Sequence, residues 1–138
     1  MRLNPPSRYA VYGAYAALFI TGVLWFVADH FKDATDGEFW QLLGARTLML
    51  HGGAAMVMLL ILGALFPLHL RRGWRAGKNR LMGAIMIALN GALIVTAFAL
   101  YYLGSEALRP WISNIHFYAG MILPILLSIH VVQGRRTR

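Results

Sequence analysis

Four long apolar runs dominate this sequence and restrict the folds that it can adopt. A helix needs about 20 apolar residues to cross the hydrocarbon core of a bilayer, and each run reaches that length. The runs cover residues 9–28, 48–70, 81–103 and 111–132. Lipid offers backbone groups no hydrogen-bond partner, so segments that cross it are expected to be helical. We therefore predict a single all-α transmembrane domain over residues 1–138, with helices at these four ranges.

The charge content agrees with a membrane protein. Only 13% of the residues are charged and 59% are hydrophobic, whereas soluble domains carry about 25% charged residues. The net charge of +8 does not indicate a nucleic-acid partner, because the charges occupy short segments between apolar runs instead of forming one basic face. The first run follows Arg2 and Arg8, as a signal peptide would. It is longer than a signal core and lacks a small-x-small cleavage site, so we interpret it as a membrane helix.

The distribution of charge predicts the orientation of the chain. Most basic residues lie at the two chain ends and between the second and third apolar runs, which fall on one side of the membrane. All 5 acidic residues fall on the other side. The positive-inside rule then predicts a bacterial inner-membrane protein with both termini in the cytoplasm. An even number of helices agrees with this, because it puts both termini on the same side. Short connections make neighbouring helices antiparallel, which predicts an up-down-up-down four-helix bundle. The basic residues on the predicted cytoplasmic side, ten of 13, are Arg2, Arg8, Arg71, Arg72, Arg75, Lys78, Arg80, Arg135, Arg136 and Arg138.

The second and fourth predicted helices each contain two histidines in phase. His51 and His69 are 18 residues apart, which puts them on one helix face about 27 Å apart along the axis. His116 and His130 are 14 residues apart, within about 40° of one face and about 21 Å apart. The two helices run in the same direction in the predicted bundle, so the first histidines share the periplasmic level and the second ones the cytoplasmic level. The axial mismatch of about 6 Å is one helical turn, which tilt or a proline bend can absorb.

Two imidazoles from facing helices at one height can fill both axial positions of a haem iron. An imidazole inside lipid is costly, so membrane histidines tend to be functional. We therefore predict two b-type haems, or one if His69, two residues before Arg71, only lies among the lipid headgroups. Cysteine is absent, which excludes iron–sulfur clusters and thioether-linked haem. We interpret the fifth histidine, His30, as an interfacial residue.

Two further kinds of residue fit a haem at these levels. Ala55 and Gly120 lie one turn beyond the periplasmic histidines and would leave room for a porphyrin, although small residues also favour close helix packing. Haem propionates pair well with arginine, which Arg46 and Arg109 could supply at the periplasmic level and Arg71 at the cytoplasmic level. The positive-inside rule alone explains a basic residue at Arg71, on the predicted cytoplasmic side. Arg46 and Arg109 lie on the other side, where basic residues are scarce.

These residues resemble the small bacterial membrane cytochromes b, which are related to the cytochrome b subunits of formate dehydrogenase and nickel–iron hydrogenase. The likeness covers nearly the whole chain, and residues 109–130 carry most of it. It implies that one histidine of the second helix and two of the fourth, spaced 14 residues apart, ligate haem. Those residues are His51, His116 and His130. Relatives of the formate dehydrogenase subunit take the fourth ligand from the first helix, where this chain has Tyr9 and Tyr12, so His69 is the expected replacement.

The expected function is electron transfer across a lipid membrane, as a carrier or as a membrane subunit of an oxidoreductase. Bis-histidine ligation leaves no open coordination site, which disfavours oxygen chemistry. The expected partners are quinone and a periplasmic redox protein or catalytic subunit, and His30, Asp29 and Trp40 are candidates for a quinone pocket. The alternative is a haem-free anchor or assembly subunit in which the histidines and Asn90 form interhelical hydrogen bonds. A proton channel or transporter is disfavoured because no acidic residue lies within a span.

Overall fold

Four long helices make up most of the chain in the computed structural model, which describes residues 4–77 and 79–136. No strand occurs in these ranges, so the predicted all-α class is confirmed. Three basic residues of the orientation argument, Arg2, Lys78 and Arg138, lie outside the described residues, and only the backbone of Arg72 is described. The helices are α1 (Pro5–Phe31), α2 (Gly37–Ala76), α3 (Arg80–Tyr102) and α4 (Arg109–Arg136).

Each helix is long and apolar enough to cross a membrane. The most apolar windows of the four helices have mean hydropathy values between 1.8 and 2.1. Large apolar side chains cover the outside of the helices, and Leu60 and Leu81 are 76% and 77% exposed. Such a surface is unfavourable in water and favourable in lipid. The chain is a multi-pass membrane protein.

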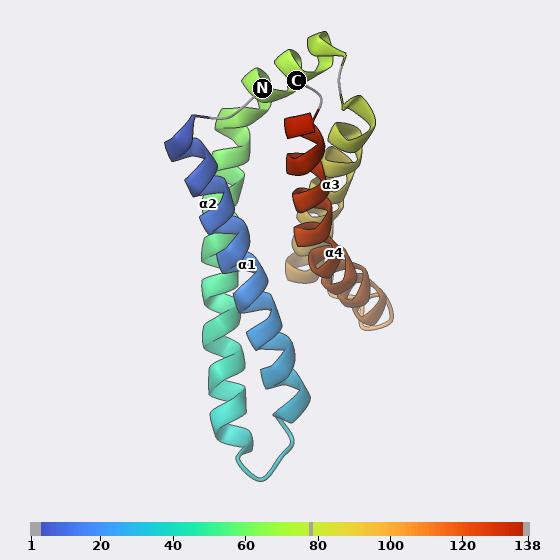
Figure 1. Cartoon of the computed structure of the whole chain (residues 1–138). Helices are drawn as coiled ribbons and strands as arrows, with labels where there is room; N and C mark the ends of the chain where they lie inside the picture. The colour runs from blue at the N-terminus through green and yellow to red at the C-terminus, as the bar shows by residue number, and fades with distance from the viewer. Residues whose placement is uncertain (1–3, 78, 137–138) are drawn as a thin grey trace. The chain divides into compact units, whose positions relative to one another are not determined.

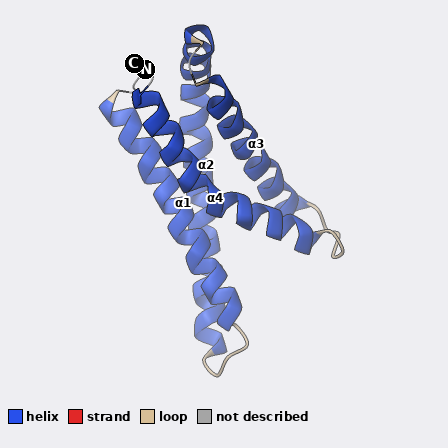
Figure 2. Ribbon diagram, turned by 45° about the vertical axis from the view of Figure 1, so that its right-hand side comes forward, coloured by secondary structure: helices blue, strands red, loops and turns tan. Residues whose placement is uncertain are grey.

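The chain forms two compact units, Arg2–Leu68 and the segment that starts at His69. The first unit contains α1 and the larger part of α2, which run side by side as a helical hairpin (Figures 1 and 2). The second contains the end of α2 and the hairpin of α3 and α4 (Figure 1). Each unit has its own internal tertiary contacts.

Small residues bring α1 and α2 close together near their connecting loop. The side chain of Ala28 is fully buried, and a Cβ added at Gly44 would lie 3.6 Å from the Ala28 Cβ. Thr47, 4% exposed, donates its hydroxyl hydrogen to the Leu43 carbonyl at 2.8 Å. Close approach over small residues is the usual way for membrane helices to gain packing energy, since lipid provides no hydrophobic drive between them.

Polar contacts define both ends of α3 in the second unit. Gly77 and Asn79 adopt left-handed φ values of 69° and 59°, a conformation suited to glycine and tolerated by asparagine. The Arg80 guanidinium then donates to the Trp74 carbonyl through Nε at 3.1 Å and through Nη2 at 2.9 Å. At the other end, Arg109 donates to the Leu100 carbonyl at 3.0 Å, which satisfies an acceptor that the helix end leaves open.

Three helices, α1, α2 and α4, extend beyond their predicted spans at both ends, most clearly α2, whereas α3 is shifted by one residue. The apolar run predicted a helix over residues 48–70, whereas α2 begins at Gly37 and ends at Ala76. The prediction followed the apolar stretch that a bilayer requires, but helical hydrogen bonding continues into water wherever the residues permit it. At 1.5 Å per residue, α2 is about 60 Å long, roughly twice the thickness of the hydrocarbon core. Its ends therefore project beyond the lipid core.

Single-cysteine labelling tests this reading of α2, because the natural sequence contains no cysteine. We expect Glu38→Cys and Gly73→Cys to react with a membrane-impermeant maleimide from opposite sides of a sealed vesicle. Leu60→Cys, in the middle of the apolar stretch, should react only after detergent is added. The cysteine-free parent measures background labelling. Rapid labelling of Leu60→Cys without detergent would contradict a membrane-spanning α2.

Candidate functional site

His51 of α2 lies against α1 within the first hairpin. Its Nδ1 is 3.0 Å from the Thr21 hydroxyl oxygen. The ring also approaches the backbone of α1 closely, since a Cβ added at Gly22 would lie 3.4 Å from the His51 Cε1. Thr21 and Gly22 therefore form one side of the space that the imidazole occupies, and any larger residue at Gly22 would press on the ring.

His116 of α4 has the same arrangement against α3 in the second unit. Its Nδ1 is 2.8 Å from the Thr96 hydroxyl oxygen. In both hairpins the histidine belongs to the second helix and the threonine to the first. His51 and His116 belong to different units, and their predicted pairing at one level stays a prediction.

The sequence analysis did not predict a role for the two threonines, although each ends a short sequence pattern that occurs in both hairpins. Residues 17–21 read Ala-Leu-Phe-Ile-Thr and residues 92–96 read Ala-Leu-Ile-Val-Thr. A second repeat begins at each histidine: residues 51–56 and 116–121 share the pattern His-x-x-Ala-(Ala or Gly)-Met. The chain thus carries the same threonine and histidine elements in each hairpin. A comparison of α1 with α3 would have revealed the threonines.

The other two predicted ligands, His69 and His130, lie together in the second unit. The centres of their rings are 6.3 Å apart, and the ring planes are inclined by 65°. His69 stands near the end of α2 and is exposed, whereas His130 of α4 is half-buried. Among the residues that the structure describes, none forms a hydrogen bond with the buried Nδ1 of His130. Asn79 donates to the backbone carbonyl of His130 at 3.5 Å.

The residues predicted to border a porphyrin or to bind its propionates all lie on α2 or α4. Arg46 and Arg71 are exposed on α2, while Arg109 begins α4 and already uses Nη1 on the Leu100 carbonyl. Ala55 and Gly120 are partly buried. A Cβ added at Gly120 would meet no described atom within 4 Å, so the space beside this residue is open.

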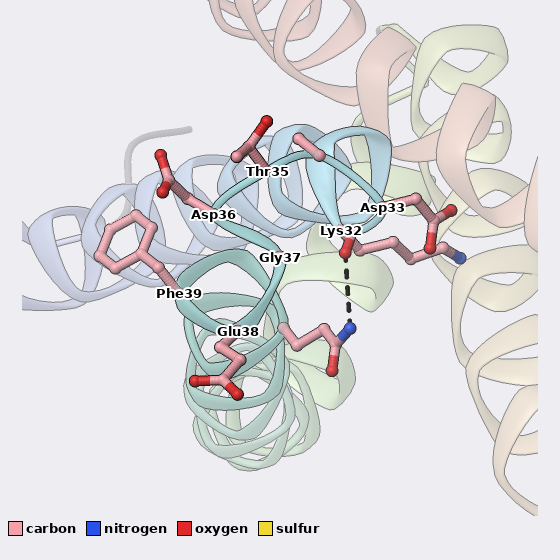
Figure 3. A pocket seen from close by; sticks show the side chains of 9 residues that line it. Lys32, Asp33, Thr35, Asp36, Gly37, Glu38 and Phe39 are labelled. Carbon is pink, nitrogen blue, oxygen red and sulfur yellow. Dashed lines mark hydrogen bonds between the residues drawn. The ribbon is translucent and has the colours of Figure 1, made fainter.

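A surface hollow of about 670 Å³ lies in the loop between α1 and α2 (Figure 3). The Gln41 amide donates to the Lys32 carbonyl at 3.4 Å and closes one side of the loop. Asp29 forms an ion pair with Lys32 at 3.0 Å, and this hydrogen bond and negative charge raise the pKa of Lys32. The lining residues are Lys32, Asp33, Ala34, Thr35, Asp36, Gly37, Glu38, Phe39 and Gln41.

The residues considered for a quinone pocket are near this hollow but do not line it. The His30 ring meets Phe31 edge to face, with ring centres 5.0 Å apart. Phe31 in turn packs on Trp40, with ring centres 5.2 Å apart. Of the predicted trio, Asp29 is engaged with Lys32. The hollow itself is open and lined mainly by polar residues, which suits water better than an apolar quinone ring.

Among the described residues, no group of three or more histidine, cysteine, aspartate or glutamate side chains occurs, whereas the rings of one histidine pair, His69 and His130, lie together. Two axial nitrogens suffice for a haem, whose porphyrin provides the remaining ligands of the iron. Known protein families, curated proteins and solved structures offered no match to this chain. The resemblance to membrane cytochromes b therefore rests on the residues alone.

A valine at Gly22 tests the close approach of His51 to α1. The γ-methyl groups of Gly22→Val would extend into the imidazole, and overpacking of this kind costs about 1–3 kcal/mol. Gly13→Val is the matched control on the same helix, since a Cβ there meets nothing within 4 Å. We expect detergent–denaturant unfolding to show a lower stability for Gly22→Val than for Gly13→Val. Equal stabilities would contradict the contact.

Proposed function

We propose that this protein transfers electrons across a membrane by means of two b-type haems, each held by two histidines. The observation that carries the proposal is the approach of His69 and His130. These residues are 61 positions apart in the chain, yet their ring centres are 6.3 Å apart in one unit. Histidines that pair within the membrane-spanning helices of a protein tend to mark a functional site.

The separation of these rings suits a shared metal ion. Imidazole nitrogens bind metals at about 2 Å, so two rings on opposite sides of one ion have their centres about 6 Å apart. The observed value of 6.3 Å agrees with this expectation. An edge-to-face ring contact can have a similar separation, and the His130 variant described below distinguishes the two explanations.

The other predicted ligands have an environment that supports ligation. A histidine that binds a metal usually donates its second ring nitrogen to a fixed acceptor, which sets the tautomer and the ring plane. His51 and His116 each have a threonine hydroxyl within hydrogen-bond distance of Nδ1. We propose that each supplies one axial position through Nε2, as the sequence predicts for the periplasmic level.

The surrounding residues would bind, shield and orient the haem groups. Met58 and Leu123, 4% and 5% exposed, belong to the apolar faces between the two histidine levels. As buried apolar side chains they would keep water away from a haem and lower the local dielectric constant, which is one way in which a protein tunes a haem potential. Arg46, Arg109 and Arg71 would offer donors to the propionates. The haem, when bound, supplies a one-electron couple between ferric and ferrous iron.

The cellular setting and the partners are also part of the proposal. Ten of 13 basic residues fall on one side of the spans, which supports an inner-membrane protein with both termini in the cytoplasm. A carrier of this kind needs a donor and an acceptor, for which we propose quinone and a periplasmic redox protein or catalytic subunit. Maleimide labelling of Glu38→Cys from outside intact cells would support this orientation.

Haem content in histidine variants tests the proposed function. We expect two haems per chain in the natural protein, with a Soret band and a reduced α band. His130→Ala and His116→Ala should each lose one haem, since an alanine leaves the iron without one axial ligand. Haem is quantified per chain by reduced-minus-oxidised spectra of protein purified from cells that are supplied with haem.

His30→Ala is the control for these variants, because His30 is exposed at the end of α1 and is not proposed as a ligand. It should keep both haems. A colourless natural protein would refute the proposal and favour a haem-free anchor or assembly subunit. Retention of both haems by His130→Ala would refute the second site alone and leave the His69–His130 contact as packing.

A further inference from the structure

The last turns of α2 carry a basic surface that begins where the apolar stretch ends. Arg71, Trp74 and Arg75 follow one another at intervals of three and one positions, which places them on one side of the helix. All three side chains are exposed, and Trp74 is 52% exposed. His69, which meets α4, lies on the other side of α2 by the same helical spacing. The two arginines therefore lie beside an exposed tryptophan and away from α4.

The turn that follows α2 adds Arg80 to this surface and holds it in place. The Arg80 guanidinium donates twice to the Trp74 carbonyl, at 3.1 and 2.9 Å, and its carbon lies 5.9 Å from the centre of the Trp74 ring. Asn79, in the same turn, donates to the His130 carbonyl at 3.5 Å and so connects the turn to α4. The side chains of this surface, here called the basic patch, are Arg71, Trp74, Arg75 and Arg80.

The basic patch lies at the level where a membrane helix leaves the lipid core. The end of α2 runs across the end of α4 in Figure 1, and the rings of His69 and His130 meet there, with their centres 6.3 Å apart. The apolar run of α2 ends at Leu70, so the patch follows directly on the spanning part of the helix. Tryptophan prefers the headgroup level, because its ring is apolar and its N–H is polar.

No acidic side chain of the same unit can neutralise the patch. Glu106 is the only acidic residue between positions 69 and 138, and it belongs to the loop at the opposite end of α3 and α4. Among the described residues, neither Arg71 nor Arg75 has a hydrogen-bond or ion-pair partner. The polar groups of arginine and tryptophan are all donors. A partner of the patch must therefore supply negative charge and acceptor oxygens, as a phosphate group does.

The positive-inside rule explains the sign of this charge but not its arrangement. The rule requires basic residues on one side of the membrane and is indifferent to their position around a helix. It does not require arginines on one face beside an exposed tryptophan. Nor does it require a turn in which Arg80 is fixed to the Trp74 carbonyl. An arrangement of this kind is expected where a charged group is bound at a defined place.

We infer that the basic patch binds the headgroup of an anionic phospholipid. The guanidinium groups donate to the phosphate oxygens, for which the planar fork of arginine is well suited. The Trp74 ring packs against the glycerol and the upper part of the acyl chains. Basic clusters next to the end of a membrane helix are a known basis for binding acidic lipids. This site goes beyond the proposed electron transfer and requires no haem.

Titration of the purified full-length protein with phosphatidylglycerol in a neutral detergent tests the site. The thermal unfolding temperature is measured at each lipid concentration, with phosphatidylcholine and inorganic phosphate as the comparison ligands. We expect phosphatidylglycerol to raise the unfolding temperature, because a ligand that binds the folded state stabilises it. The comparison ligands should have little effect. An equal rise with phosphatidylcholine would overturn recognition of the charge, and an equal rise with inorganic phosphate would overturn a lipid as the occupant.

Variants of Arg75 separate a defined site from a general charge effect. Arg75→Gln should weaken the apparent affinity for phosphatidylglycerol about fivefold. Gly73→Arg combined with Arg75→Gln keeps the net charge and moves one arginine to the opposite side of α2, where a Cβ at Gly73 meets nothing within 4 Å. It should show a similar loss. Arg8→Gln removes one charge from α1 on the same predicted side of the membrane and should bind as the natural protein does.

Natural affinity in the combined variant, or an equal loss in Arg8→Gln, would show that only total charge matters and would overturn the site. Arg75 is exposed and has no partner among the described residues, so its substitution removes no contact of the fold. Anionic lipid that copurifies with each variant, quantified by mass spectrometry, gives a second readout and should fall in both Arg75 variants. Neither measurement depends on haem, so a colourless protein would refute the proposed function and leave this site intact.

Discussion

A polar group inside a bilayer has to find its hydrogen-bond partner within the protein, and this constraint governs the structure at every level. It makes each span a helix, because only a helix satisfies its own backbone in lipid. It explains why the hydroxyls of Thr21, Thr47, Thr96 and Ser128 all donate to carbonyls of their own helix. His51 and His116 each lie within hydrogen-bond distance of one of these hydroxyls, so the same constraint also brings a ring of one helix to a hydroxyl of its neighbour.

The two hairpins share this element but differ at the second histidine. His130 follows His116 by 14 residues, whereas the residue 14 positions after His51 is Leu65, and His69 comes one turn later. His69 and His130 belong to one compact unit together with α3 and α4. The repeated part of the chain therefore accounts for one histidine in each hairpin, whereas His69, near the end of the apolar run of residues 48–70, departs from the repeat.

The sequence predicted features that depend on one helix more fully than features that depend on two. Hydropathy identified all four helices, since bilayer thickness acts on each span separately. It placed the start of α2 at residue 48 instead of Gly37, because water places no apolar requirement on the additional turns. The phase of His69 and His130 predicted a shared level in the membrane, which stays a prediction, while the structure shows that their ring centres are 6.3 Å apart. Thr21 and Thr96 were not predicted, since a hydroxyl on a helix has a role only when the neighbouring helix supplies the ring.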